Sequence, residues 1–160
     1  MGLQAEMQAL TPATKPPRLR RRTITLDDGH RVGVSVCGDG VPLVMVHGIV
    51  AEGMLYARTL RRLAGLGFRV FAVDSVPAAD RLLDEQPVDA AVLSDDLPDG
   101  GADQVECHLR IRNPTPCVVR TSTGPSTGGG TPPAAARLEK PFDLTTLANL
   151  LKTSDSSVPK

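Results

Sequence analysis

The amino-acid sequence predicts an α/β fold, a doubly wound and mainly parallel sheet with helices on both faces. From residue 42 onward, short apolar runs alternate with amphipathic stretches, and alternating strands and helices form parallel sheets of this kind. Val, Leu and Ala must fill the core, because the 160-residue chain has three Phe, one Tyr and no Trp. Such aliphatic side chains suit strands that are buried on both faces. The length corresponds to a single domain.

A β-hairpin is predicted ahead of the parallel sheet. Two alternating runs, Thr23–Leu26 and Arg31–Val36, flank an Asp-Gly pair at residues 28–29, which is typical of a tight turn between antiparallel strands. The basic run Arg18–Arg22 before it is interpreted as part of a solvated tail. We therefore expect a flexible basic tail, one α/β domain that opens with the hairpin, and a flexible C-terminal tail. Their boundaries are 1–21, 22–152 (hairpin 22–38, remainder 42–152) and 153–160.

The remaining elements follow from apolar runs and helical periodicity. Continuous apolar runs predict buried strands, and leucines on one face of a stretch with arginines elsewhere predict an amphipathic helix. The predicted strands are 42–46, 68–73, 88–93, 116–121 and 137–139, and the predicted helices are 51–66, 77–85, 102–112 and 144–152. Residues 122–133, STGPSTGGGTPP, stand where another helix is expected, but their Gly and Pro content predicts a mobile loop.

Composition and charge exclude several classes of function. Eighteen Lys and Arg balance eighteen Asp and Glu, so the chain has no net field that would draw it to nucleic acid or to an anionic membrane. The few aromatic residues leave little for base stacking, and the apolar runs are too short to cross a bilayer. Three cysteines without metal-binding spacing indicate reduced thiols. We therefore expect a cytoplasmic protein without a nucleic-acid or membrane partner.

Residues 42–152 resemble a response-regulator receiver domain of the CheY-like, flavodoxin-like type. The resemblance is closest in GFRVFAVDSVPAADRLLDEQPVDAAVLSDDLPDG, from Gly67, and in LEKPFDLTTLANLL, from Leu138. It implies the receiver strand order 2-1-3-4-5 and a site at the carboxyl ends of the strands. In such a site an aspartate accepts a phosphoryl group, while a divalent cation and a lysine stabilise the phosphoryl oxygens.

The resemblance also assigns site positions, and most of them depart from the receiver pattern. The positions are His47 and Gly48 (acidic pair), Ser94 (phospho-acceptor), Thr121 (hydroxyl), Arg137 (aromatic switch) and Lys140 (lysine). Only Thr121 and Lys140 match the residue types of the receiver pattern. Asp95 and Asp96 come one and two residues after the acceptor position, and neighbouring strand residues face opposite sides of a sheet. Without the acidic pair the site lacks the carboxylates that bind Mg²⁺. We expect a degenerate site without phosphorylation, Mg²⁺ or another cofactor, with Asp95 or Asp96 left open as a substitute acceptor.

Residues 20–75 also resemble the N-terminal part of an α/β-hydrolase. The resemblance rests on RRTITLDDGHRVGVSVCGDGVPLVMVHG and LRRLAGLGFRVFAVD, and it implies that the loop at His47 and Gly48 supplies an oxyanion-hole N–H. Residues 124–128, GPSTG, match the GxSxG pattern around a catalytic serine, here Ser126. All three histidines precede Ser126, whereas these hydrolases place the base after the serine, so hydrolase activity is not expected.

The two resemblances are compatible with one sheet. In a hydrolase the opening hairpin pairs with the strand equivalent to 68–73, which is a sheet edge in a receiver. The predicted strand order is therefore hairpin strand 1, hairpin strand 2, 68–73, 42–46, 88–93, 116–121, 137–139. At the carboxyl edge of this sheet, Asp74, His47, Ser94 and Thr121 would line a small crevice of the kind in which open α/β sheets bind ligands.

The chain is thus interpreted as an atypical receiver-like regulatory or protein-interaction module, not an enzyme, with an unidentified protein as its partner. Two alternatives remain open. One is a truncated or inactive α/β-hydrolase-like protein of the esterase type. The other is a hydrolase–receiver chimera, natural or engineered, with no evolved activity.

Overall fold

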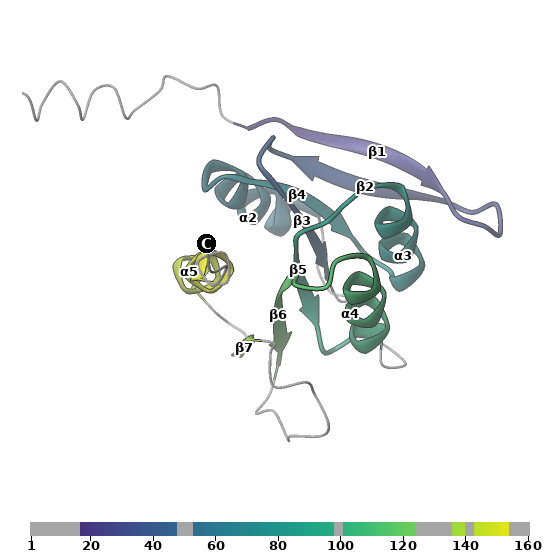
Figure 1. Ribbon diagram of the computed structural model, residues 1–160. Helices are drawn as coiled ribbons and strands as arrows, with labels where there is room; N and C mark the ends of the chain where they lie inside the picture. Colours follow the sequence, from purple (N-terminus) through teal and green to yellow (C-terminus); the bar gives the residue numbers. More distant parts are fainter. Residues whose placement is uncertain (1–16, 48–52, 98–100, 124–135, 140–142, 154–160) are drawn as a thin grey trace, which may run out of the picture.

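One seven-stranded sheet carries the fold, with helices on both of its faces (Figure 1). The computed structural model describes residues 17–47, 53–97, 101–123, 136–139 and 143–153. The strands in these ranges are β1 (Leu19–Thr25), β2 (Arg31–Cys37), β3 (Val41–Val46), β4 (Phe68–Val73), β5 (Ala90–Ser94), β6 (Cys117–Ser122) and β7 (Ala136–Glu139). The helices are α2 (Gly53–Gly65), α3 (Val76–Glu85), α4 (Gly101–Arg112) and α5 (Leu144–Thr153).

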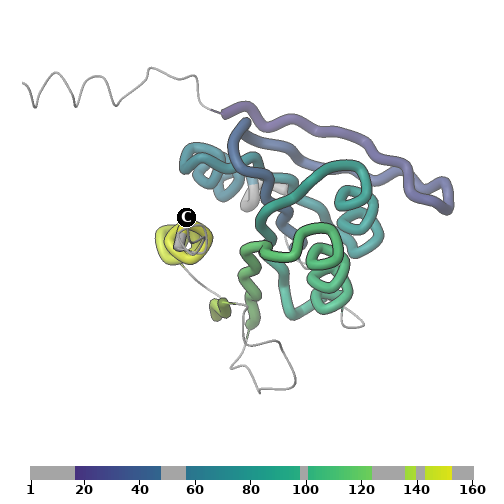
Figure 2. Tube along the Cα trace, in the orientation of Figure 1, coloured from purple at the N-terminus to yellow at the C-terminus, as the bar shows by residue number. Residues whose placement is uncertain are grey.

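The strand order is β1-β2-β4-β3-β5-β6-β7, which confirms the predicted order in full. The part from β4 to β7 is parallel throughout and has the receiver order 2-1-3-4-5. The hairpin strands β1 and β2 are antiparallel to each other, and β2 is antiparallel to β4. Figure 2 follows the chain from the hairpin at one edge of the sheet to β7 at the other. The fold is therefore flavodoxin-like, with a hairpin added at the β4 edge.

Alternation along the buried strands divides the core between the two faces of the sheet. In β3, Val44 and Val46 pack on the face covered by α3 and α4, whereas Leu43 and Met45 pack on the face covered by α2 and α5. Side chains of successive strand residues point to opposite faces, so a strand buried on both sides is apolar at every position. The two layers of helices hold the parallel strands in place, and the carboxyl ends of these strands meet at one edge.

The predicted tail boundary at residue 21 is wrong, because β1 begins at Leu19. The backbone of Arg20–Arg22 pairs with that of Val34–Val36, while the three arginine side chains are exposed. An edge strand tolerates such charges, since its outer side and one of its faces meet water. Three consecutive arginines lack the polar–apolar alternation that predicts a strand, and the strand is recognised only from its backbone pairing with β2. The predicted tails at 1–16 and 154–160, and the predicted loop from residue 124 onward, lie outside the described residues.

Two glycines join the hairpin to the rest of the sheet. Gly38 follows β2 with a φ of +91°, and a Cβ at this position would lie 2.2 Å from the Phe68 carbonyl oxygen. A Cβ at Gly40 would lie 1.9 Å from the Gly67 carbonyl oxygen. The backbone after β2 thus passes directly against the start of β4, where a side chain has no room. The hairpin is therefore an integral part of the sheet.

Replacing Gly38 by alanine is expected to lower the free energy of unfolding by about 2 kcal/mol, from the positive φ and the backbone clash together. Gly29→Ala is the matched control, because Gly29 also has a positive φ of +87° but its Cβ would meet nothing within 4 Å. The control is expected to lose only about 1 kcal/mol, the strain alone. Urea denaturation measures both variants. Equal losses would contradict the close packing at Gly38.

Candidate functional site

Three of the predicted site residues lie at the carboxyl ends of neighbouring parallel strands. His47 directly follows β3, and its backbone N–H donates to the Val73 carbonyl oxygen (3.2 Å). Ser94 ends β5 and pairs in register with Thr121 of β6. Both hydroxyl side chains are buried, with exposed fractions of 2% for Ser94 and 3% for Thr121. The residue predicted to stand at the receiver acceptor position, Ser94, is thus an uncharged alcohol in a buried setting.

The turn after β5 is held by backbone and side-chain hydrogen bonds. The Asp95 N–H donates to the Thr121 carbonyl oxygen (2.7 Å), which extends the β5–β6 pairing by one residue. The Asp96 N–H donates to Ser94 Oγ (3.3 Å), and Thr123 Oγ1 donates to an Asp96 carboxylate oxygen (3.0 Å). The Ser94 hydroxyl oxygen therefore accepts a hydrogen bond that stabilises this turn. The Asp96 carboxylate is bonded to Thr123, just after the end of β6.

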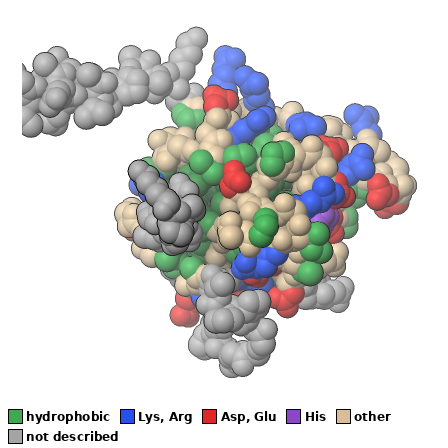
Figure 3. Space-filling model, viewed as in Figure 1, with side chains coloured by type: hydrophobic (Ala, Val, Ile, Leu, Met, Phe, Trp, Pro, Cys, Tyr) green, Lys and Arg blue, Asp and Glu red, His purple; other side chains and the backbone are tan. Residues whose placement is uncertain are grey.

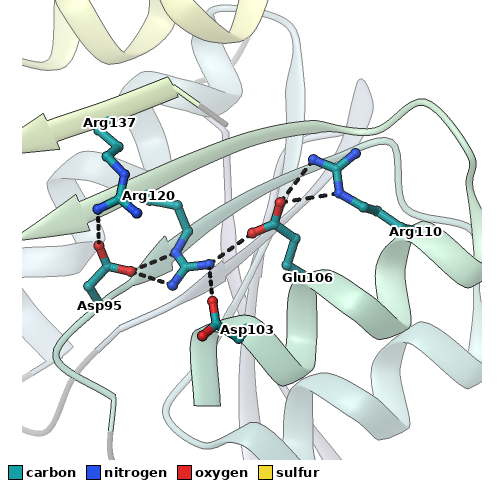
Figure 4. Close-up of polar contacts among 6 residues, drawn as sticks. All are labelled: Asp95, Asp103, Glu106, Arg110, Arg120 and Arg137. Atoms are coloured by element: carbon teal, nitrogen blue, oxygen red, sulfur yellow. Dashed lines mark hydrogen bonds and ion pairs between the residues drawn. The ribbon is translucent and has the colours of Figure 1, made fainter. Parts of the chain in front are cut away.

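Asp95 belongs to a network of ion pairs centred on Arg120 of β6 (Figure 4). Arg120 Nε donates to Asp95 Oδ1 (2.6 Å), and Arg137 Nη1 donates to Asp95 Oδ2 (3.4 Å). Both carboxylate oxygens of Asp95 are therefore bonded to guanidinium groups. The side chain that follows the acceptor position thus links the end of β5 to β6 and β7.

The same arginine reaches two carboxylates on α4. Arg120 Nη1 donates to Asp103 Oδ1 (2.9 Å) and to Glu106 Oε2 (2.8 Å). The other oxygen of Glu106 accepts two hydrogen bonds from Arg110, one turn further along the helix (2.9 and 3.2 Å). We call these six residues the Arg120 network: Asp95, Asp103, Glu106, Arg110, Arg120 and Arg137.

The buried charges of the Arg120 network need partners of opposite charge. The side chains of Arg120 and Glu106 are only 6% and 4% exposed. Burial by itself lowers the pKa of Arg120, but the hydrogen bonds to Asp103, Asp95 and Glu106 outweigh it and raise the pKa above the ordinary value. Three arginines face three carboxylates, so the network as a whole is neutral. A buried charge that loses its partner costs several kcal/mol, so Arg120 and Glu106 depend on each other.

The Arg120 network was not predicted from the sequence, although the sequence contains a signal for it. Arg120 is a charged residue inside the otherwise apolar strand segment CVVRT, and a buried arginine requires carboxylate partners. Asp103 and Glu106 stand three residues apart on the preceding helix, on one face. An acidic pair at this spacing ahead of an arginine in a buried strand indicates such an ion-pair network.

The remaining predicted site residues divide into two groups. Arg137, the position of the aromatic switch, lies on β7 opposite Arg120 in the β6–β7 register and faces Asp95. Asp74 follows β4 at the same carboxyl edge. Lys140, Gly48 and Ser126 lie outside the described residues. The structure therefore brings together the acceptor, hydroxyl and switch positions of the predicted degenerate site.

A second polar cluster joins α3 to α4 away from this edge. His108 Nδ1 and Nε2 lie 2.9 and 3.1 Å from carboxylate oxygens of Asp80 and Asp84. Gln104 donates to Asp80 (2.9 Å), and Arg112 pairs with Asp84. The hydrogen bond from Arg112, with a smaller one from His108, holds the pKa of Asp84 below its ordinary value. The cluster fixes the two helices that cover this face of the sheet.

The cysteines are all free thiols. Cys37 is buried, and its burial raises the pKa of the thiol, whereas Cys107 is exposed. Within the ranges that the structure describes, no group of three or more His, Cys, Asp or Glu side chains is placed to hold a metal ion. None of the helices in these ranges is long and apolar enough to cross a membrane.

Solved structures of receivers are similar to most of this chain. A response-regulator receiver protein from Sinorhizobium medicae is 24% identical with a TM-score of 0.62, over 74% of this chain and 97% of its own. A receiver domain from Methylobacillus flagellatus is 22% identical with a TM-score of 0.59, over 72% and 99%. The receiver domain of a sensor histidine kinase from Pseudomonas aeruginosa, with magnesium in its active-site cleft, is 22% identical with a TM-score of 0.58, over 74% and 100%. The chain has the fold of this class.

A shorter stretch is similar to a different kind of protein. Over 57 residues the chain is 49% identical to a protein of Mycobacterium phage D29 that is named as a non-heme haloperoxidase. This stretch is 36% of the chain and 20% of the phage protein, so the chain spans about a fifth of that protein's length. The match fits the predicted combination of a hydrolase-like part with a receiver-like part. No family model matches the sequence.

Proposed function

We propose that this chain is a receiver-like regulatory module that acts through protein contacts and does not accept a phosphoryl group. The observation that carries the proposal is the state of Asp95. Its two carboxylate oxygens are bonded to Arg120 and Arg137, and the acceptor position before it is the buried alcohol of Ser94. The receiver fold supports the regulatory class, and the ion pairs argue against the usual chemistry.

The chemical reason lies in what an acyl-phosphate needs. A carboxylate oxygen must be free to attack phosphorus, and a cation must neutralise the phosphoryl oxygens during transfer. For Asp95 to attack, it would have to leave a guanidinium that is only 6% exposed, and the separation of such a pair is costly. In place of two carboxylates after the first parallel strand, this chain has His47 and Gly48, so the usual ligands for Mg²⁺ are missing at these positions.

The same contacts suggest how the module holds one conformation without phosphorylation. Arg137 stands at the switch position on β7, and it is bonded to Asp95 at the end of β5. Arg120 joins that point to α4. In a phosphorylated receiver, a bound phosphoryl group links the acceptor edge to the switch. Here we propose that arginine–carboxylate pairs make this link permanently.

Treatment with acetyl phosphate or beryllofluoride in the presence of Mg²⁺ is expected to leave the intact mass and the amide NMR spectrum unchanged. A conventional receiver treated in parallel serves as the positive control. A gain of one phosphoryl group, or a Mg²⁺-dependent change in the amide spectrum, would overturn the proposal. In that case Asp95→Asn and Asp96→Asn would identify the acceptor.

A hydrolase is the second candidate, and the similarity to the phage D29 protein favours it. The candidate catalytic serine, Ser126, is preceded by all three histidines of the chain, so it lacks the usual general base of such enzymes. Turnover of p-nitrophenyl acetate that disappears in Ser126→Ala would support the enzyme. Equal turnover by the parent chain and the variant would exclude Ser126 as its nucleophile.

A further inference from the structure

We infer that a groove beside the hairpin binds an acidic, extended peptide segment of a partner protein. The inference rests on the proposed function, since it names the chemistry of the partner with which the module makes contact. The groove has a volume of about 550 Å³, and we call it the basic groove. Its main lining residues are Arg18, Arg20, Arg22, Val36, Arg69 and Phe71.

The basic groove lies on the face of the sheet that α3 covers only in part. Ile24, at the turn end of β1, packs in the core cluster of α3. Arg22 pairs with Glu85, the last residue of α3 (3.2 Å). Beyond this point, toward the start of β1, Arg18 and Arg20 are exposed and line the groove together with residues of β2 and β4. The groove therefore begins where α3 ends.

Strand alternation places arginines and apolar side chains together on this face. Arg20 lies opposite Val36, and Val36 lies opposite Phe71 of the next strand. The guanidinium carbon of Arg69 lies 5.1 Å from the centre of the Phe71 ring. Val36 is thus the apolar part of the groove floor, Phe71 lies buried beneath it, and arginines lie along the sides.

Its positive charge is poorly balanced. Among the residues that the structure describes, Arg18, Arg20 and Arg21 take part in no ion pair, and the pair of Arg22 with Glu85 is largely exposed. Asp39 is the one acidic residue of the lining. Figure 3 shows Lys and Arg side chains gathered along the hairpin. In a chain with zero net charge, this is a local excess that a negatively charged partner would neutralise.

An extended peptide fits this surface better than nucleic acid does. Among the described strands, β1 is an edge of the sheet, so a peptide strand that pairs with its outer backbone groups would run along the rim of the basic groove, beside its floor. Every second side chain of such a strand would lie on the face of Arg20 and Arg22, where carboxylates pair with guanidinium groups in a bidentate way. Single-stranded nucleic acid needs exposed aromatic rings for stacking, whereas Phe71 is only 1% exposed.

The test is fluorescence anisotropy of the full chain with a labelled peptide of alternating Glu and Val. Binding is expected, and it should weaken as salt is raised, because exposed charge pairs are screened. Arg20→Glu and Arg18→Glu are each expected to weaken binding about tenfold or more. Lys152→Glu on α5 makes the same change from a positive to a negative charge at an exposed position on another element, and it is expected to leave binding unchanged. Circular dichroism checks that each variant is folded.

A peptide methylated on alternate backbone nitrogens tests the added strand. It has the same charge but cannot donate those hydrogen bonds, so its binding is expected to be lost. The inference would be overturned by no binding of the parent peptide, by an equal loss in Lys152→Glu, or by tighter binding of single-stranded DNA of equal charge. These results are separate from the acetyl phosphate experiment, which tests the proposed function without the groove.

Discussion

Replacing Arg120 by methionine is expected to lower the free energy of unfolding by about 4 kcal/mol, the usual cost of breaking a buried ion pair by removing one partner. Methionine keeps much of the volume of the arginine stem but none of its donors. Among the residues that the structure describes, Glu106, which is 4% exposed, would keep only Arg110, and Asp95 would keep only the longer contact with Arg137. Asp103 is 72% exposed and can turn to water, so it should contribute little to the loss.

Urea denaturation of Arg120→Met at constant pH measures this loss. Arg137→Met is the control, because the contact of Arg137 with Asp95 is long, at 3.4 Å, and its side chain is 33% exposed; the loss of this exposed pair should cost less than about 1 kcal/mol. Combining Arg120→Met with Glu106→Met and Asp95→Asn should recover much of the stability, since the buried charges are then removed together. A small loss in Arg120→Met, or no recovery in the combination, would show that Arg120 does not hold this network.

The sequence predicted the sheet well because local patterns and the topology of α/β folds restrict each other. Apolar runs such as the one at Leu43–Val46 must be buried on both faces, and right-handed crossovers then leave few possible strand orders. The position of the hairpin was predicted from the resemblance to α/β-hydrolases, in which the opening hairpin pairs with the strand equivalent to β4. The pairing of Val36 with Phe71 confirms it. Gly38 adds a physical reason, because only glycine permits so close an approach between the end of β2 and the start of β4.

The start of β1 was predicted wrongly because charge concealed the strand. Arg20–Arg22 show no alternation of polar and apolar side chains. Their strand conformation is evident only from the backbone pairing with Val34–Val36. Edge strands commonly carry such charges, which prevent pairing with a strand that is uncharged or of the same charge. The residues that pair with Arg20–Arg22 lie 12 to 16 residues later in the chain, across the hairpin turn, so a pattern within a short window of sequence does not reveal the pairing.

The sequence predicted where the backbone of the candidate site lies, but it did not predict the ion pairs between its side chains. Ser94 and Thr121 meet because both end parallel strands in one register, and this follows from strand order alone. The bonding of Asp95 to Arg120 depends on which face each side chain takes and on how α4 lies across β5 and β6. That helix position is a tertiary property. The sequence left Asp95 open as a substitute acceptor, and the ion pairs of the folded chain are what argue against it.

Replacing Ser94 by aspartate restores the residue type of a receiver acceptor, and it is expected to destabilise the chain by about 3 kcal/mol at neutral pH. Ser94 is 2% exposed, so the new carboxyl would be taken out of water. Burial raises the pKa of such a carboxyl, because it disfavours the charged form. Since the pKa in the folded state is then above that of the unfolded chain, stability is kept at low pH and is lost as the pH rises through the raised pKa.

Ser94→Asn is the matched control, with nearly the same size and no charge. The difference in unfolding free energy between the two variants should be small near about pH 4 and reach about 3 kcal/mol near about pH 7. Added Mg²⁺ is not expected to reduce the difference, because His47 stands where a carboxylate would be needed and Asp95 is held by Arg120. Stabilisation of Ser94→Asp alone by Mg²⁺, together with phosphorylation by acetyl phosphate, would show that one substitution rebuilds the phospho-site. That result would mean that the proposed absence of phosphorylation depends on Ser94 and not on the arginines around it.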